Sequence, residues 1–294
     1  MKKNIKAIIA LSLVLNLVAM SPPRCVKATE ENVDANEFFE EGGVFGDISD
    51  IDNIRDIFSS FSGEDELNWY YVGKGKDQVA EGPKESASFL KESGGYFLGD
   101  TSNKVLYLTF DEGYENGNTG KILDILKACN VPAAFFVVKP YITTEPELVK
   151  RMVDEGHLVC NHTVHHPSIA QIRDKEKFTA EFTGVEDAFK ELTGQDMPKF
   201  FRPPMGKYSK KSLEMTKDLG YKTIFWSFAY KDWLVKSQPS ESYAVEKIRK
   251  GAHPGSIMLL HAVSDTNTKV LESVIKTLQA DGYEFKSLND LPEQ

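Results

Sequence analysis

The sequence predicts an α/β fold whose parallel strands are covered by helices, with the sheet either closed into a barrel or open and doubly wound. Strand-like and helix-like segments alternate from residue 104 onward, and some strands are apolar throughout, such as residues 133–138. Continuously apolar strands are typical of parallel sheets that are buried on both faces. Chemistry in such folds gathers at the carboxyl ends of the strands, where polar side chains also follow several strands of this sequence.

The N-terminus has the layout of a secretory signal peptide. Lys2, Lys3 and Lys6 precede an apolar run over residues 7–20, and a polar stretch follows that ends at Ala28. The run has about 14 residues, fewer than the roughly 20 that a membrane-spanning helix needs. We therefore expect a secreted protein from which residues 1–28 are cleaved, with an uncleaved signal anchor as the alternative.

The chain is acidic, with a formal net charge of −9. Residues 1–28 carry five basic and no acidic side chains, so the remainder has a net charge of −14. An acidic protein repels phosphate backbones, which argues against nucleic acid as a partner. Beyond the signal segment only Cys129 and Cys160 remain, too few for a disulfide scaffold.

Three parts are expected after the signal segment. Residues 29–66 are rich in Glu, Asp, Gly and Ser, which predicts an acidic linker or flexible, weakly ordered arm. Residues 67–103 are expected to form an N-terminal extension that packs on the barrel. Residues 104–294 are expected to form the main domain.

Strands and helices alternate in this main part. The helix over residues 121–128 places four apolar side chains on one face, and residues 178–192 repeat apolar side chains at spacings of four and three. The other helical segments are residues 147–154, 209–219 and 241–250. Strand formers are concentrated in residues 104–110, 133–138, 157–160, 199–202, 222–228 and 256–261.

Two carboxylates, Asp111 and Glu112, directly follow the first strand, and Gly113 then lets the chain turn. One carboxylate can act as a base and the other as a metal ligand. Taken alone, the pair is more simply explained as two turn-forming acids.

Three of the six histidines lie within residues 162–166. His162 and His166 are separated by three residues, and two imidazoles at this spacing can converge on one ion where the backbone makes a helical turn. A carboxylate from elsewhere would complete a metal site with open positions for water. The alternative is a surface or polar-core cluster.

Three further polar residues stand at the ends of predicted strands. Arg202 precedes a loop stiffened by two prolines and can orient a buried carboxylate, or it can be a solvated arginine in a rigid connector. His261 ends an apolar strand, where a histidine is usually a satisfied core residue. An acid such as Asp232 bonded to it would raise its pKa and make it a proton donor.

In chain order, the segments TFDEG, HTVHH, RPPMG, KDW and LLH resemble the motifs of the NodB homology domain of carbohydrate esterase family 4, the polysaccharide deacetylases. The resemblance runs from about residue 67 to the end. It is closest to the delta-lactam-biosynthetic de-N-acetylase branch, in TFDEGYENG, NHTVHHP, FWSFAYKDW and HPGSIMLLHAVS. It implies a distorted (β/α)7-type barrel and hydrolytic N-deacetylation of peptidoglycan amino sugars.

The resemblance also implies roles for single residues. Asp111 would be the general base and His261 the general acid, while Arg202 would hold Asp111 and Asp232 would tune His261. His165 matches no catalytic role. The residues expected to contact the sugar are Arg202, Met205, Tyr114 and Trp233.

The implied cofactor is a divalent metal ion, zinc first, with cobalt or manganese as alternatives. Glu112, His162 and His166 would be its ligands. Most of the family has Asp where this chain has Glu112, and glutamate is one methylene longer. The ion is therefore expected to shift, to bind more weakly or to be held through water.

In the lactam-forming branch the sugar is N-acetylmuramic acid, whose freed amine can close on its own lactyl carboxyl to give the muramic delta-lactam of spore cortex. We therefore expect a monomeric enzyme that acts outside the cytoplasm on peptidoglycan glycan strands, without a stable protein partner. The alternatives are deacetylation of chitin oligomers, of N-acetylglucosamine in peptidoglycan or of xylan, and a catalytically weak carbohydrate-binding homologue.

Overall fold

The computed structural model describes residues 63–294, so the predicted signal peptide and most of the predicted acidic linker lie outside the described residues. The strands are β1 (Leu67–Asn68), β2 (Gly95–Tyr96), β3 (Val105–Glu112), β4 (Ala133–Val137), β5 (Leu158–Asn161), β6 (Phe200–Phe201), β7 (Lys207–Tyr208), β8 (Lys222–Ile224), β9 (Ser256–His261) and β10 (Glu284–Phe285). The α-helices are α3 (Thr119–Cys129), α4 (Lys139–Thr144), α5 (Pro146–Asp154), α6 (Lys175–Thr193), α7 (Lys210–Asp218), α8 (Glu241–Gly251) and α9 (Asp265–Ala280).

The main sheet is parallel and curls into a barrel. Its order is β10-β3-β4-β5-β6-β8-β2, and β9 pairs with the other side of β3. Just after β8, Phe228 forms a parallel bridge with Met258 of β9. The pairings thus lead from β3 through β8 to β9 and back to β3, which confirms the predicted barrel and excludes the open sheet.

Side chains of β3 alternate between two cores, as the pleat of a strand requires. Val105 and Tyr107 belong to the cluster inside the barrel, which also contains Phe136 and Cys160. Leu106, Leu108 and Phe110 belong to the larger cluster between the sheet and the helices. This alternation decides where the polar residues at the end of β3 point.

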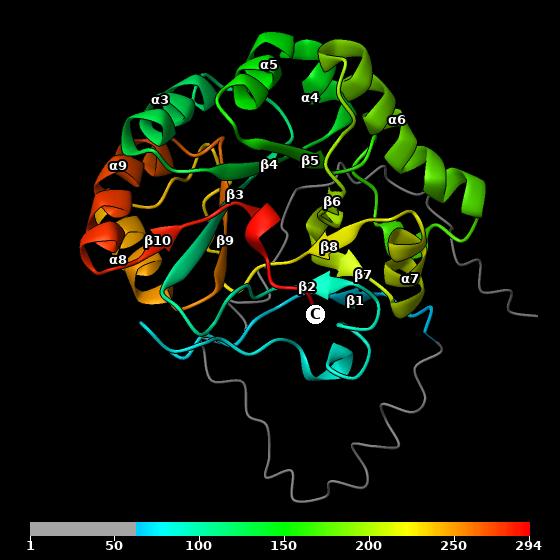
Figure 1. The fold of residues 1–294 in the computed structure, drawn as a ribbon, viewed down its shortest axis with the longest axis horizontal. Helices are drawn as coiled ribbons and strands as arrows, with labels where there is room; N and C mark the ends of the chain where they lie inside the picture. The colour runs from blue at the N-terminus through cyan, green and yellow to red at the C-terminus, as the bar shows by residue number, and fades with distance from the viewer. Residues whose placement is uncertain (1–62) are drawn as a thin grey trace, which may run out of the picture. The chain divides into compact units, whose positions relative to one another are not determined.

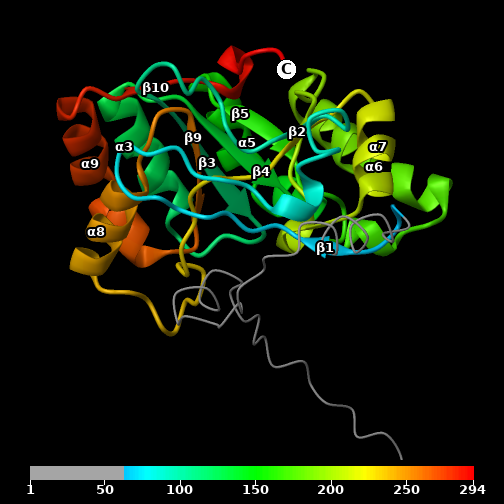
Figure 2. The same ribbon diagram turned by 90° about the horizontal axis from the view of Figure 1, so that it is seen from below.

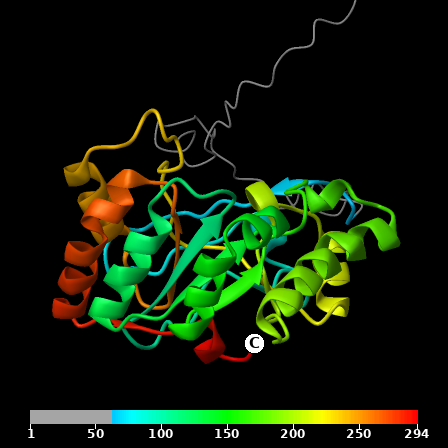
Figure 3. The same cartoon turned by 90° about the horizontal axis from the view of Figure 1, so that it is seen from above.

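Helices cover the outside of the sheet. In Figure 1, α9, α3, α5, α4 and α6 follow one another around it. The N-terminus of α6 is capped by the Asp174 side chain, which accepts a hydrogen bond from the Lys177 N–H, and the helix ends at Gly194 in a left-handed conformation. In Figure 3, the arrowhead of β3 and the loop leading into α8 lie on the side of the barrel away from the C-terminus.

Residues 67–103 contact the barrel through both backbone and side chains, and Figure 2 shows their course across it. Strand β2 pairs with β8, and β1 pairs antiparallel with β7. Trp69 stacks on Phe225 with ring centroids 4.1 Å apart. The end of the predicted linker is described too, and Glu66 forms an ion pair with Lys207 at 2.9 Å. The proposed boundaries between the parts stay predictions.

Several elements differ from the sequence prediction. Strand β3 continues to Glu112, two residues past the predicted end. Strand β8 stops at Ile224 instead of residue 228, because the chain changes neighbours there: Phe225 bonds to Tyr96, whereas Ser227 bonds to Ile257. Helices α4 and α9 were not predicted.

Over residues 63–294, no helix is both long and apolar enough to cross a membrane.

Candidate active site

Asp111 is the last inward-facing residue of β3, and a buried arginine holds it. Arg202, which follows β6, is fully buried and donates from Nη1 to Asp111 Oδ1 at 2.8 Å. Its other hydrogen bonds, to the Thr109 hydroxyl and the Ile224 carbonyl, fix the guanidinium within the barrel. The structure thus contains the contact predicted for Arg202, which leaves Asp111 Oδ2 for other partners.

The charges around Asp111 decide its protonation. Burial is the largest single influence and would raise the pKa of this carboxyl, but the charge and hydrogen bond of Arg202, together with the neighbouring His162 and His261, exceed it and lower the pKa. Asp111 is therefore a carboxylate at neutral pH.

The two predicted metal-binding histidines lie together beside Asp111. The rings of His162 and His166 have centroids 4.9 Å apart, and His162 Nε2 lies 3.7 Å from Asp111 Oδ2. His162 Nδ1 donates to the Arg202 carbonyl at 2.8 Å, so Nε2 carries the lone pair. Burial lowers the pKa of His162 to about 4 and also lowers the pKa of His166. Both imidazoles are therefore neutral, as metal ligands must be.

His261 enters the site from the neighbouring strand. Strands β3 and β9 pair in a register that sets Asp111 opposite His261. The His261 ring bonds through Nδ1 to Asp232 Oδ1 at 2.6 Å, and the fully buried Asp232 also accepts from the His261 N–H at 2.8 Å. Burial alone would lower the pKa of His261, but the charge and hydrogen bond of Asp232 overcome this and raise it.

Glu112 lies elsewhere, against the prediction that it joins His162 and His166. Because β3 continues through Glu112, this side chain points to the helix-facing side of the strand, opposite to Asp111. It is fully buried there, 3.4 Å from the Thr119 hydroxyl. Burial raises the pKa of Glu112 well above its usual range, and the charge of Glu115 raises it further.

The described residues fit a metal ion only in part. His162 and His166 have the donor chemistry and protonation of ligands, and the carbonyl behind His162 orients its ring as is usual for metal-bound histidine. However, over residues 63–294 no three His, Cys, Asp or Glu side chains come together as a metal-binding group. Of the three predicted ligands, His162 and His166 thus lie together, whereas Glu112 lies on the other face of β3.

The residues expected to contact the sugar differ in their exposure and in their contacts with this site. Trp233 is half-buried with its ring centroid 5.3 Å from that of His261. Met205 is 45% exposed and adopts a positive φ of 58°, so the loop after Arg202 presents it to solvent. Tyr114 is 56% exposed at the end of β3. Of the three, Trp233 has a contact that ties it to a candidate catalytic residue.

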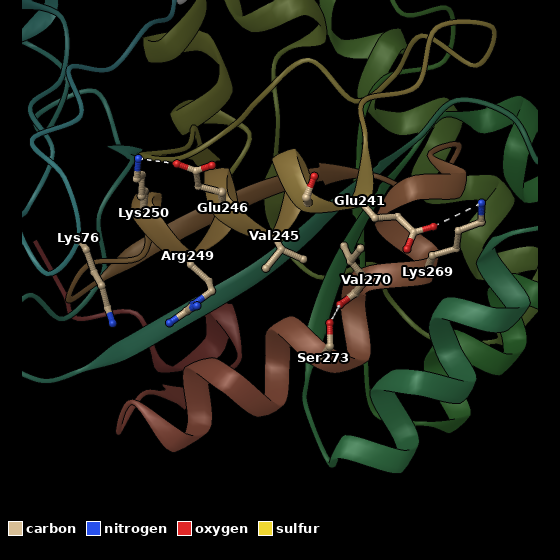
Figure 4. Close-up of a pocket in the computed structure, with 10 residues that line it drawn as sticks. Lys76, Glu241, Val245, Glu246, Arg249, Lys250, Lys269, Val270 and Ser273 are labelled. Carbon is tan, nitrogen blue, oxygen red and sulfur yellow. Dashed lines mark hydrogen bonds and ion pairs between the residues drawn. The ribbon is translucent and has the colours of Figure 1, made fainter.

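A surface groove of about 560 Å³ lies away from these residues, between α8 and α9. Figure 4 shows its floor at Val245 and Val270 and its rim of charged side chains. Two of its lysines are paired with its two glutamates, Lys250 with Glu246 and Lys269 with Glu241. None of the predicted site residues lines it.

Sequence reasoning missed two supporting residues. The Thr109 hydroxyl bridges the site, accepting from Arg202 and donating to the Met258 carbonyl at 2.7 Å. Its place two residues before Asp111, on the same face of the strand, could have indicated it. Glu181 of α6 bonds to the loop that carries the histidines. No signal in a single sequence points to it, because the contact depends on how α6 packs.

Comparison with known proteins agrees with this geometry. The family model described as polysaccharide deacetylase matches residues 98–224. The chain is 40% identical over 225 residues to the peptidoglycan-N-acetylmuramic acid deacetylase PdaA of Bacillus subtilis, an alignment that covers 76% of this chain and 85% of that protein. The chain belongs to the polysaccharide deacetylases of carbohydrate esterase family 4.

Other relatives support the family and widen its range of substrates. An uncharacterized 30.6 kDa protein of Geobacillus stearothermophilus is 46% identical over 76% of this chain and 84% of its own length. The solved structure of Bacillus subtilis PdaA, a family 4 carbohydrate esterase, superposes with a TM-score of 0.75 at 39% identity, covering 78% of this chain and 97% of that one. A chitooligosaccharide deacetylase of Bradyrhizobium is 33% identical over 66% of this chain and 93% of its own length.

Family membership confirms the fold and the class of enzyme predicted from the motifs. Deacetylases of this family are metal-dependent hydrolases, and related members act on different N-acetylated glycans. The roles predicted for single residues stay predictions.

Proposed function

We propose that this chain hydrolyses the N-acetyl group of N-acetylmuramic acid in peptidoglycan, on the way to the muramic delta-lactam of spore cortex. The observation that carries this proposal is the register of β3 and β9, which sets a candidate base, Asp111, beside a candidate acid, His261. The similarity to a deacetylase named for N-acetylmuramic acid supports this sugar. The signal peptide predicted over residues 1–28 supports action outside the cytoplasm.

The chemistry follows from the two protonation states. Asp111, ionised beside Arg202, takes a proton from the water that attacks the acetamide carbonyl carbon. His261, whose raised pKa favours the protonated form, gives its proton to the sugar nitrogen as the C–N bond breaks. Asp232 accepts the hydrogen bond from Nδ1 of the His261 ring, so the proton that is transferred is the one on Nε2. The products are acetate and a free amino sugar.

His162 and His166 are proposed as the protein ligands of the metal ion, zinc first, with cobalt or manganese as alternatives. When bound, a divalent ion supplies Lewis-acid polarisation of the acetamide carbonyl. Trp233, Met205 and Tyr114 are proposed to contact the sugar, and Arg202 is proposed to act on it through Asp111. We further propose that the protein works as a secreted monomer on glycan strands, without a stable protein partner.

The experiment that tests this function measures acetate released from peptidoglycan by the purified protein, with and without a chelator, followed by mass analysis of the muropeptides. Chitin oligomers and acetylated xylan are assayed in parallel. Chelator-sensitive release from peptidoglycan, with deacetylated muramic acid or its delta-lactam among the products, is expected. Release only from chitin oligomers, from xylan or from N-acetylglucosamine would contradict the choice of sugar.

The position of Glu112 favours a second candidate, a carbohydrate-binding homologue in which the metal site is too weak for catalysis. That candidate predicts binding to N-acetylated glycans without acetate release, and no response to added zinc, cobalt or manganese. Measurement of glycan binding and acetate release on one preparation separates the two.

A further inference from the structure

The loop that carries the candidate metal ligands, residues 162–166 and here termed the histidine loop, has an unusual backbone. Thr163 has φ of 72° and His166 has φ of 58°, although neither is glycine. Left-handed conformations are rare for residues with a Cβ, especially for a β-branched residue such as threonine. They persist only where the surrounding structure holds them. The histidine loop therefore needs support from outside itself.

Glu181 of α6 supplies the first part of this support. Its Oε2 accepts hydrogen bonds from the backbone N–H groups of Val164 and His165, both at 3.0 Å, and its Oε1 lies 2.7 Å from His165 Nδ1. The Glu181 side chain is only 13% exposed, whereas that of His165 is 76% exposed. Charged acceptors make the stronger hydrogen bonds to amides. One carboxylate thus anchors the middle of the histidine loop.

Gly184, three residues further along α6 and on the same helical face, supplies the second part. A Cβ at Gly184 would lie 2.7 Å from the Val164 Cγ2 atom, closer than real Cβ atoms approach other atoms. Glycine is a poor residue for the middle of a helix. Its presence here is explained by the need to seat Val164 directly against the helix.

We propose that Glu181 and Gly184 are positioning residues that hold His162 and His166 at the separation required to bind the metal. The proposal rests on the proposed function for its link to catalysis, but its link to the structure of the loop stands alone. Inside the loop, the Asn161 and Thr163 side chains accept from the N–H groups of Thr163 and His166, both at 2.9 Å. Those bonds fix each end of the loop, and α6 fixes its middle.

The test for Glu181 uses two substitutions and a control. Glu181→Ala removes all three contacts and leaves a good helix former. Glu181→Gln keeps one carbonyl oxygen for the two amides. Glu191→Ala is the matched control, because Glu191 is an exposed glutamate on the same helix. The readouts are amide hydrogen exchange at Val164 and His165 without metal, Zn²⁺ affinity by competition with a chromophoric chelator, and kcat and KM on peptidoglycan.

Glu181→Ala is expected to speed exchange at both amides and to weaken Zn²⁺ binding by about 10- to 100-fold, as loss of a group that orients metal ligands does. The loss in activity is expected in kcat rather than KM. Glu181→Gln is expected to recover part of the affinity, and Glu191→Ala to match the wild type. Unchanged exchange and unchanged Zn²⁺ affinity in Glu181→Ala would overturn the role of Glu181.

The test for Gly184 adds a methyl group at residue 184 and then removes side-chain volume at Val164. Gly184→Ala is expected to weaken Zn²⁺ binding without lowering the melting temperature of the protein, because alanine favours the helix. Adding Val164→Ala removes the colliding methyl group and is expected to restore the affinity. Failure of the double variant to recover, or no loss in the single variant, would overturn the role of Gly184. Zn²⁺ affinity and hydrogen exchange can be measured even if the wild type has no deacetylase activity. Failure of this positioning proposal can therefore be distinguished from failure of the proposed function.

Discussion

Two adjacent carboxyl groups, Asp111 and Glu112, lie on opposite faces of β3, and their pKa values shift in opposite directions. On the barrel side, Asp111 meets Arg202, and the pKa of the carboxyl is lowered. On the helix side, Glu112 is buried near another acid, Glu115, and its pKa is raised well above the usual range. The Glu112 side chain is fully buried and that of Asp111 is only 13% exposed, so burial alone does not explain the opposite directions of the two pKa shifts. The charged groups that each side chain meets on its own face of the strand therefore decide in which direction the pKa of that carboxyl moves.

The largest expected effect comes from removing the charge on the barrel side. Asp111→Asn keeps the shape but cannot accept the proton of water, and its rate of acetate release from peptidoglycan is expected to fall by about 10²- to 10⁴-fold. Binding of the glycan, measured by pull-down with sacculi, serves as the control and should persist. A variant that keeps the wild-type rate would show that another group is the base.

The second largest effect on the rate is expected when the partner of His261, the residue opposite Asp111, is changed. Asp232→Asn removes the charge that raises the pKa of His261, so this pKa is expected to fall. His261 then loses its proton at lower pH, and the alkaline limb of the kcat profile should move to lower pH. Above that limb the rate is expected to drop by about 10²-fold, the lower end of what a general acid contributes. An unmoved alkaline limb would assign it to a different group.

A smaller change in rate is expected when Asp111 loses its partner but keeps its charge. Arg202→Met removes the main cause of the lowered pKa of Asp111, so the acid limb of the kcat profile should move to higher pH. Each pH unit of movement costs about tenfold in rate below the limb. Because Arg202 is fully buried, the variant also loses about 3–5 kcal/mol of stability, which urea unfolding measures. An acid limb that stays in place would separate Arg202 from the base.

The smallest effect on activity is expected on the helix side of the strand. Glu112→Gln replaces a buried acid, whose raised pKa favours its neutral form, by a neutral amide of the same size, so acetate release and Zn²⁺ affinity should match the wild type. Stability should differ instead. Since the folded pKa of Glu112 lies above the unfolded value, the wild type loses stability as pH rises from the unfolded pKa, by up to about 1.4 kcal/mol per pH unit.

The Glu112→Gln variant lacks the loss of stability that ionisation of Glu112 causes as pH rises. Its melting temperature is therefore expected to exceed that of the wild type at pH 8, and the difference should shrink at pH 5. A variant less stable than the wild type at pH 8 would mean that Glu112 is ionised and paired.

The strand and helix pattern predicted a parallel α/β fold, the resemblance to the family implied the barrel, and the ends of the predicted strands indicated which residues meet inside it. Asp111, Arg202 and His261 each follow or end a predicted parallel strand, and the carboxyl ends of such strands necessarily meet. The direction of Glu112 could not be predicted in this way. The predicted strand ended at residue 110, whereas pairing with β4 continues it to Glu112 and fixes the side chain on the opposite face.

Two other features depend on contacts far apart in the sequence. Glu181 accepts a hydrogen bond from the backbone N–H of Val164, which is 17 residues away in the sequence. Only the packing of α6 beside the histidine loop brings the two together. Helix α9 is different, because the sequence itself carries signals for it. Ser264 caps it by accepting from the Asn267 N–H, and its buried apolar side chains recur at helical spacing, at Val270, Leu271, Val274, Ile275 and Leu278.

The most direct test of this account compares the two neighbouring carboxyl groups in one assay. Acetate release from peptidoglycan is measured for the wild type, Asp111→Asn and Glu112→Gln at the same zinc concentration. The account predicts release by the wild type and Glu112→Gln at equal rates and near-complete loss in Asp111→Asn. Equal loss in both variants would contradict it, because Glu112 would then have to leave the helix side of β3 and act in the site.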